Sequence, residues 1–203
     1  RVVQVEQQIP LEKKDTLEQT RNIIRLCKET GVKPAWLAVD RTGNGTGVHD
    51  ALRSMFGDQV FGIMFGWAAT DTRSLEDDTE ACSERYHDII TEMAFAVRKF
   101  METDTLKLNP GINWNALERE TITRRYHQQG RGMLKIEPKK EFKKRYNGQS
   151  PDRFDSLLVA IHGVRMNEGI STRMVQNPIN QNKNRRPMEH GIVDVLDFID
   201  MST

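Results

Sequence analysis

The chain has 203 residues, of which 37% are hydrophobic and 29% are charged, and its formal net charge is +1. This length suits one domain with a substantial core. No apolar run reaches the roughly 18 residues of a membrane span, and the start has no signal-peptide pattern, so a membrane protein is not expected. Cys27 and Cys82 lie in helical patterns without a partner motif, which excludes a disulfide framework and predicts two buried thiols.

The first part of the chain alternates apolar segments with helical patterns. Strands are expected at residues 1–9, 36–39 and 60–65, and helices at residues 16–30 and 48–56. Asp15 stands where it can cap the first helix, and Gly31 stands where that helix should end. This order of strand, helix, strand, helix and strand favours a largely parallel sheet covered by helices, which is an α/β fold.

The second part of the chain is richer in helices. Helices are expected at residues 79–103, 114–126, 137–146 and 150–167, with short edge strands, interpreted as antiparallel, at 106–108 and 133–136. Ser150 and Pro151 form a helix start signal, with the serine as N-cap. No internal repeat is apparent, so residues 1–168 are interpreted as one domain. Residues 169–203 are interpreted as a polar tail with a short apolar and acidic segment that could dock as a helix.

Asp40 closes the second apolar strand and is followed by Gly43, Gly45 and Gly47. In open α/β sheets ligands gather at the carboxyl ends of the strands, so Asp40 is a candidate ligand or catalytic group. Two other interpretations stay open. The aspartate could only cap the turn, or the glycines could bind a dinucleotide. The latter requires an acid about 20 residues further on, where the chain has no carboxylate in residues 65–67.

Asp152 and Asp155 are three residues apart, so they share one side of the first turn of the last helix. Together with Asp40 they supply oxygen ligands of the kind that Mg²⁺ or Mn²⁺ prefers. Two such ions about 4 Å apart would support hydrolysis of a phosphodiester. The alternative is that both acids only complement the helix macrodipole.

Residues 124–145 are strongly basic, and within them Phe142 interleaves with charged side chains. The residues expected to hold a phosphate backbone are Lys139, Lys140, Lys143, Lys144 and Arg145. The alternative is a solvated helix face. His162 follows Asp155 by seven residues and is interpreted as a partly exposed helical histidine rather than a site residue.

Two segments, LAVDRTGNGTGVHDAL and IEPKKEFKKRYNGQSPDRFDSLLVAI, resemble the nuclease domain of the large terminase subunit of tailed bacteriophages. The resemblance covers roughly residues 2–165 and implies a ribonuclease H-like mixed sheet flanked by helices. It further implies that Asp40 and Asp152 bind two Mg²⁺ or Mn²⁺ ions, with Asp155 as a further ligand or partner. The implied activity is cutting of double-stranded DNA with little sequence specificity, in the cytoplasm of an infected bacterium, beside other terminase subunits and the capsid portal.

One departure from that family's pattern concerns the metal site. The family has another metal-binding aspartate on its first strand, whereas residues 1–9 look like its third strand, so the first two strands are expected upstream. Glu6 is the only acid on this segment and is a weak substitute. The alternative function is therefore a non-catalytic module of the same fold that binds DNA or the portal. No GxxxxGK[ST] motif for an ATPase occurs.

Overall fold

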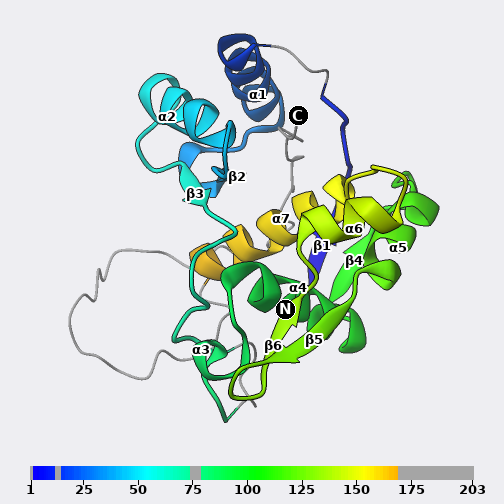
Figure 1. Cartoon of the computed structure of the whole chain (residues 1–203). Coiled ribbons are helices and arrows are strands. Elements are labelled where there is room, and N and C mark those ends of the chain that lie inside the picture. Colours follow the sequence, from blue (N-terminus) through cyan, green and yellow to red (C-terminus); the bar gives the residue numbers. More distant parts are fainter. Residues whose placement is uncertain (1, 12–14, 74–78, 169–203) are drawn as a thin grey trace.

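The computed structural model describes residues 2–11, 15–73 and 79–168, and these form an α/β fold (Figure 1). In chain order the elements are β1 (Val3–Val5), α1 (Thr16–Thr30), the 3₁₀ helix η1 (Pro34–Trp36), β2 (Ala38–Asp40), α2 (Gly45–Met55), β3 (Phe61–Ile63), α3 (Cys82–Arg85), α4 (Ile89–Glu102), β4 (Leu106–Leu108), α5 (Trp114–Thr123), β5 (Tyr126–Gln129), β6 (Met133–Ile136), α6 (Lys139–Arg145) and α7 (Asp152–Glu168). Within the described ranges, none of these helices combines the length and apolarity needed to span a bilayer. The predicted tail, residues 169–203, lies outside the described residues.

The described strands associate in three pairs. β1 is parallel to β4, β2 is parallel to β3, and β5 and β6 form an antiparallel hairpin. The predicted α/β class is confirmed, but the first three strands do not form one continuous parallel sheet, because β1 pairs with β4. The segment 106–108 was expected as an antiparallel edge strand, but it pairs in parallel with β1. Helix α4 carries the chain back before a tight turn at Asp104 (φ 55°), so β4 runs in the same direction as β1.

Helix α7 lies at the centre of the molecule and contacts both halves of it. Figure 1 shows α7 crossing between the layer of α1, α2, β2 and β3 and the layer of α4, α5 and the remaining strands. Its apolar side chains share one core with α4, β1 and β4, whereas α1, α2 and β2 enclose a second core. At Gly163 the helix approaches β2 so closely that an added Cβ would lie 2.8 Å from the Cβ of Ala38. This contact fixes α7 against the strand that ends at Asp40.

The first helix begins and ends where the sequence predicts. The Asp15 side chain accepts hydrogen bonds from the backbone N–H groups of Leu17 and Glu18, at 2.9 and 3.0 Å. Gly31 ends the helix in the left-handed region with φ 77°, where the absence of a Cβ removes the steric cost. Both ends of α1 are thus set by residues next to them in the sequence.

The turn after β2 is shorter than the glycine pattern predicts. Strand β2 begins at Ala38, because Pro34 starts a 3₁₀ turn that includes Trp36. Helix α2 begins at Gly45 rather than at Val48. Only Gly43 makes the left-handed turn, with φ 60°.

The apolar pattern at 79–103 forms two helices, α3 and α4, instead of one. Tyr86 between them is extended (φ −117°, ψ 138°) and forms a β-bridge with Leu134. Asp88 then caps α4 by accepting the N–H of Thr91 at 3.1 Å. The break arises because burial of Tyr86, which is 2% exposed, and the aspartate cap override helical periodicity. Similarly, the expected helix 114–126 ends at Thr123, and Tyr126 starts the hairpin.

Candidate active-site pocket

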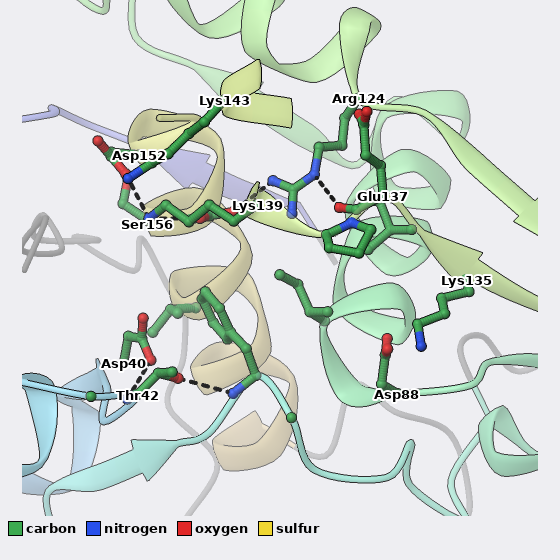
Figure 2. A pocket seen from close by; sticks show the side chains of 18 of the residues that line it. Asp40, Thr42, Asp88, Arg124, Lys135, Glu137, Lys139, Lys143, Asp152 and Ser156 are labelled. Atoms are coloured by element: carbon green, nitrogen blue, oxygen red, sulfur yellow. Dashed lines mark hydrogen bonds and ion pairs between the residues drawn. The ribbon is translucent and has the colours of Figure 1, made fainter. Parts of the chain in front are cut away.

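A cavity of about 690 Å³ opens where the end of β2 meets β6, α6 and the first turn of α7 (Figure 2). Apolar and glycine residues from both halves of the molecule line part of it. Its charged lining consists of the acids Asp40, Asp88, Glu137, Asp152 and Asp155 and the bases Arg124, Lys135, Lys139 and Lys143. The three predicted site acids therefore share one pocket, although they come from a strand end and a helix start far apart in the chain.

Asp40 is held at the edge of β2 by the turn that follows it. Its Oδ1 accepts the N–H of Thr42 at 2.8 Å, and the Thr42 hydroxyl accepts the N–H of Phe65 at 3.2 Å, as Figure 2 shows. Burial raises the pKa of the Asp40 carboxyl, and the negative charge of Asp155 raises it further, while the Thr42 bonds and Lys139 oppose the shift. The turn-capping interpretation is thus correct for one oxygen, and the carboxylate also faces the pocket.

Asp155 is nearly buried, with a side chain 8% exposed, and forms an ion pair with Arg124. Arg124 Nη1 lies 3.1 Å from Asp155 Oδ1, and Arg124 Nε donates to the backbone carbonyl of Glu137 at 3.0 Å. The guanidinium therefore joins the end of β6 to the first turn of α7. Because a lone charge is costly to bury, the guanidinium compensates the charge of Asp155 in the interior.

Lys139 lies inside the pocket instead of projecting toward solvent. Its Nζ is 2.8 Å from Asp152 Oδ1 and 3.4 Å from Asp155 Oδ2. The ammonium group, on α6, thus bridges the two carboxylates of α7 (Figure 2). The sequence placed Lys139 among the residues that hold a phosphate backbone, whereas in this structure its charge is directed at the predicted metal ligands.

The other four predicted DNA contacts differ in their surroundings. Lys144 pairs with Glu141 at 2.9 Å, and Arg145 Nε donates to Glu137 at 2.7 Å. Lys143 lines the pocket, and Lys140 is exposed. Among the residues that the structure describes, these last two lysines form no ion pair. Both therefore have ammonium groups available to an anionic ligand.

The start of α7 is fixed by a residue that the sequence did not indicate. The predicted cap, Ser150, is wrong, because its Oγ is buried and has no hydrogen-bond partner in the described part of the chain. Glu120 of α5 instead accepts the N–H of Phe154 at 2.9 Å. Burial raises the pKa of Glu120 to about 7, and the nearby negative charge of Asp152 contributes. Glu120 thus positions the turn that carries both α7 aspartates.

Four charged residues of the pocket lining were not predicted as site residues, namely Asp88, Arg124, Lys135 and Glu137. The apolar periodicity predicts one continuous helix through Asp88, whereas the polar pair His87 and Asp88 before an apolar run is a signal for a helix start. Lys135 belongs to the basic stretch and ends on the same wall as Asp88 (Figure 2). The signal for Lys135 would have been the alternation along β6, because successive side chains of a strand point to opposite faces and Lys135 lies between Leu134 and Ile136.

Glu6 and His162 lie outside this pocket lining. Glu6 accepts a hydrogen bond from Asn109 at 3.1 Å, so it adds no carboxylate to this lining. His162 is 3% exposed and stacks on Phe61 with ring centroids 6.2 Å apart. The prediction of a partly exposed histidine is wrong, because α7 is buried around most of its circumference. Burial lowers the pKa of His162 to about 3, and the charge of Arg165 adds to this effect.

The carboxylate oxygens of the pocket are the kind of ligand that a hard divalent cation prefers, but they are not arranged as a full set of metal ligands. Within the described ranges, no group of three or more His, Cys, Asp or Glu side chains is placed to hold a metal ion. Asp155 Oδ2 is buried and, among the described residues, makes no hydrogen bond; Lys139 Nζ at 3.4 Å is its charged contact. Carboxylate oxygens gathered around a positive group fit Mg²⁺ or Mn²⁺ chemically. In this arrangement the Lys139 ammonium supplies the positive charge next to Asp152 and Asp155.

Comparison with known proteins supports the fold. No protein-family model matches the sequence, and no curated protein matches it. Among solved structures, the nuclease domain of the large terminase subunit gp2 of bacterial virus Sf6 is similar, with a TM-score of 0.57, 18% identity and coverage of 73% of each chain. The resemblance predicted from the two sequence segments is thereby confirmed at the level of the fold. The chain has the fold of a terminase nuclease domain.

Proposed function

We propose that this chain is a divalent-metal-dependent endonuclease domain that cuts double-stranded DNA during packaging of a viral genome. The observation that carries this proposal is the presence of Asp40, Asp152 and Asp155 in one pocket of a protein with a terminase nuclease fold. Carboxylates from a strand end and a helix start are suited to hold two Mg²⁺ or Mn²⁺ ions. When bound, such ions supply an activated water and neutralise charge on the phosphate.

The residues of the chain would divide the remaining work. Asp40 and Asp152 are the proposed ligands, and Asp155 assists them from its buried position beside Arg124. Glu120 holds the first turn of α7 and so orients two of the three acids. These roles require no large movement of the backbone, because the Arg124–Asp155 ion pair and the Glu120–Phe154 hydrogen bond are already formed.

Substrate binding is assigned to the lysines at and near the rim. Lys143 in the pocket and Lys140 on the exposed side of α6 are placed to contact phosphates. Phosphate contacts position a duplex without reading its bases, so the expected sequence specificity is low. Because the fold is similar to a terminase nuclease domain, we also propose other terminase subunits and the capsid portal as partners. We propose that they act together in the cytoplasm of the infected bacterium.

A second candidate function is a DNA- or portal-binding module of the same fold without chemistry. The ion pairs of Asp155 with Arg124 and Lys139 favour it, because they already neutralise an acid that the nuclease needs for metal binding. This candidate predicts DNA retention that weakens steeply with salt. It predicts no cleavage stimulated by Mn²⁺.

The deciding experiment is cleavage of supercoiled plasmid by the full chain with Mn²⁺. Nicking or linearisation that is lost in Asp40→Asn and Asp152→Asn, and retained in Asp50→Asn, supports the nuclease. Asp50 is a matched control because its side chain is 63% exposed on α2 and outside the pocket lining. Cutting that is unchanged in Asp40→Asn overturns the assignment. Salt-dependent retention without cutting by any variant decides for the binding module.

A further inference from the structure

The ion pairs of Lys139 raise the question of what a divalent cation would have to displace. Lys139 Nζ approaches Asp152 Oδ1 at 2.8 Å and Asp155 Oδ2 at 3.4 Å. Both carboxylate oxygens are buried, and the Asp155 side chain is 8% exposed. The side chains of Lys139 and Asp152 are 30% and 26% exposed, but the ammonium sits at the end of a flexible four-carbon stem, whereas the carboxylate of Asp152 is attached close to the backbone of α7. The lysine can therefore leave toward solvent more easily than the carboxylates can.

The position of Lys139 in its own helix indicates that the aspartates hold it there. Lys139 is the first residue of α6 and directly follows Pro138. A cation at a helix start is opposed by the partial positive charge of the unsatisfied N–H groups. The other basic residues at the end of α6, by contrast, are favourably placed. The attraction of Asp152 and Asp155 thus compensates an otherwise unfavourable location.

One ammonium and one metal ion cannot occupy the same oxygens together. Two cations a few ångströms apart repel each other strongly in a partly buried site. A metal that binds Asp152 and Asp155 would therefore have to expel Lys139 from between them. An ammonium group is a flexible point charge on a four-carbon stem, so this release needs only side-chain rotation.

We infer that Lys139 competes with divalent cations for Asp152 and Asp155 and thereby sets the cation affinity of the pocket. The inference rests on the proposed function, because it assumes that these acids are metal ligands. It assigns Lys139 a role distinct from the DNA contact expected from the sequence. With no metal bound, the lysine neutralises the carboxylates, and with metal bound it is released.

The test is calorimetric titration of Mn²⁺ into the full chain and into Lys139→Gln, with no DNA present. Removal of the competing charge should tighten Mn²⁺ binding by about two- to thirtyfold, since two partly exposed ion pairs no longer oppose the metal. Lys143→Gln is the matched control. Lys143 belongs to the same helix and lines the same pocket, and its substitution changes the charge equally without removing an ion pair to any residue that the structure describes.

A second measurement separates competition from a purely structural ion pair. Without metal, Lys139→Gln should have a lower Tm than the parent chain, because two carboxylates lose a shared cation. Saturating Mn²⁺ should then raise the Tm of Lys139→Gln more than that of the parent chain. An equal or smaller rise overturns the inference.

The outcomes distinguish this inference from the proposed function. Mn²⁺ binding that Asp152→Asn abolishes supports the proposed site, and unchanged or weaker affinity in Lys139→Gln then overturns the competition alone. Equal tightening in Lys139→Gln and Lys143→Gln also overturns it, because a general charge effect would suffice. If neither the parent chain nor Lys139→Gln binds Mn²⁺, the proposed metal site itself is wrong.

Discussion

Glu120 Oε2 accepts the backbone N–H of Phe154 at 2.9 Å and so joins the middle of α5 to the first turn of α7. An unsatisfied N–H group at a helix start is usually capped by a residue just before it. Here a residue from another helix provides the acceptor, and burial raises its pKa to about 7. The geometry of Asp152 and Asp155 therefore depends on a carboxyl that titrates near neutrality.

The first prediction concerns the pH dependence of stability through Glu120. Its folded pKa, about 7, lies above the ordinary value of 4.5, so the folded state holds the proton more tightly than the unfolded state does. This contribution to stability is complete below about pH 4.5 and is lost as the pH rises through about 7. Glu120→Gln keeps an acceptor and removes the titration. Urea unfolding between pH 4.5 and 8 should show a smaller loss of stability in this variant, and no such difference in the control Glu118→Gln.

The second prediction has the opposite sign and concerns His162. Its folded pKa of about 3 lies below the ordinary value of 6.5, so the unfolded state takes up the proton first. Stability is then complete above about pH 6.5 and decreases toward pH 3, by at most about 1.4 kcal/mol per pH unit. His162→Leu should flatten this acid limb in urea unfolding. An acid limb as steep in His162→Leu as in the parent chain, or one equally flattened by His127→Gln on the exposed strand β5, would contradict this account.

The third prediction tests the close approach of α7 to β2. Gly163→Ala would place a Cβ 2.8 Å from the Cβ of Ala38, so the helix must move away at a cost of about 1–3 kcal/mol. Gly47→Ala is the matched control in α2, where the added Cβ would lie 3.5 Å from Thr16. That change should be neutral or stabilising by up to about 1 kcal/mol. Chemical unfolding measures both, and Ala38→Gly should restore part of the stability lost in Gly163→Ala.

The fourth prediction concerns the buried ion pair of Arg124 and Asp155. Arg124→Met should destabilise the protein by about 3–5 kcal/mol, because it leaves a carboxylate buried without its guanidinium partner. The double variant Arg124→Met, Asp155→Leu should be clearly more stable than the single variant, since neither charge then remains in the interior. A double-mutant cycle of unfolding free energies measures the coupling. Strictly additive effects would show that Lys139 alone suffices to neutralise Asp155.

Local sequence chemistry determined several features of this protein. The Asp15 cap, the Gly31 stop and hence the position of α1 follow from residues acting on their own neighbourhood. The three site acids could also be named from the sequence, because strand ends and helix starts are where α/β folds place polar groups. Their roles as metal ligands stay predictions.

Only the tertiary structure decided which strands pair, where the helix at 79–103 breaks, and what surrounds the acids. The cap of α7 comes from a residue 34 positions away, and the partner of Asp155 from one 31 positions away. The direction of Lys139 toward Asp152 likewise depends on how α6 packs against α7. Periodicity and propensity describe interactions within a few residues, whereas burial and charge neutralisation act between segments that meet only when the chain folds.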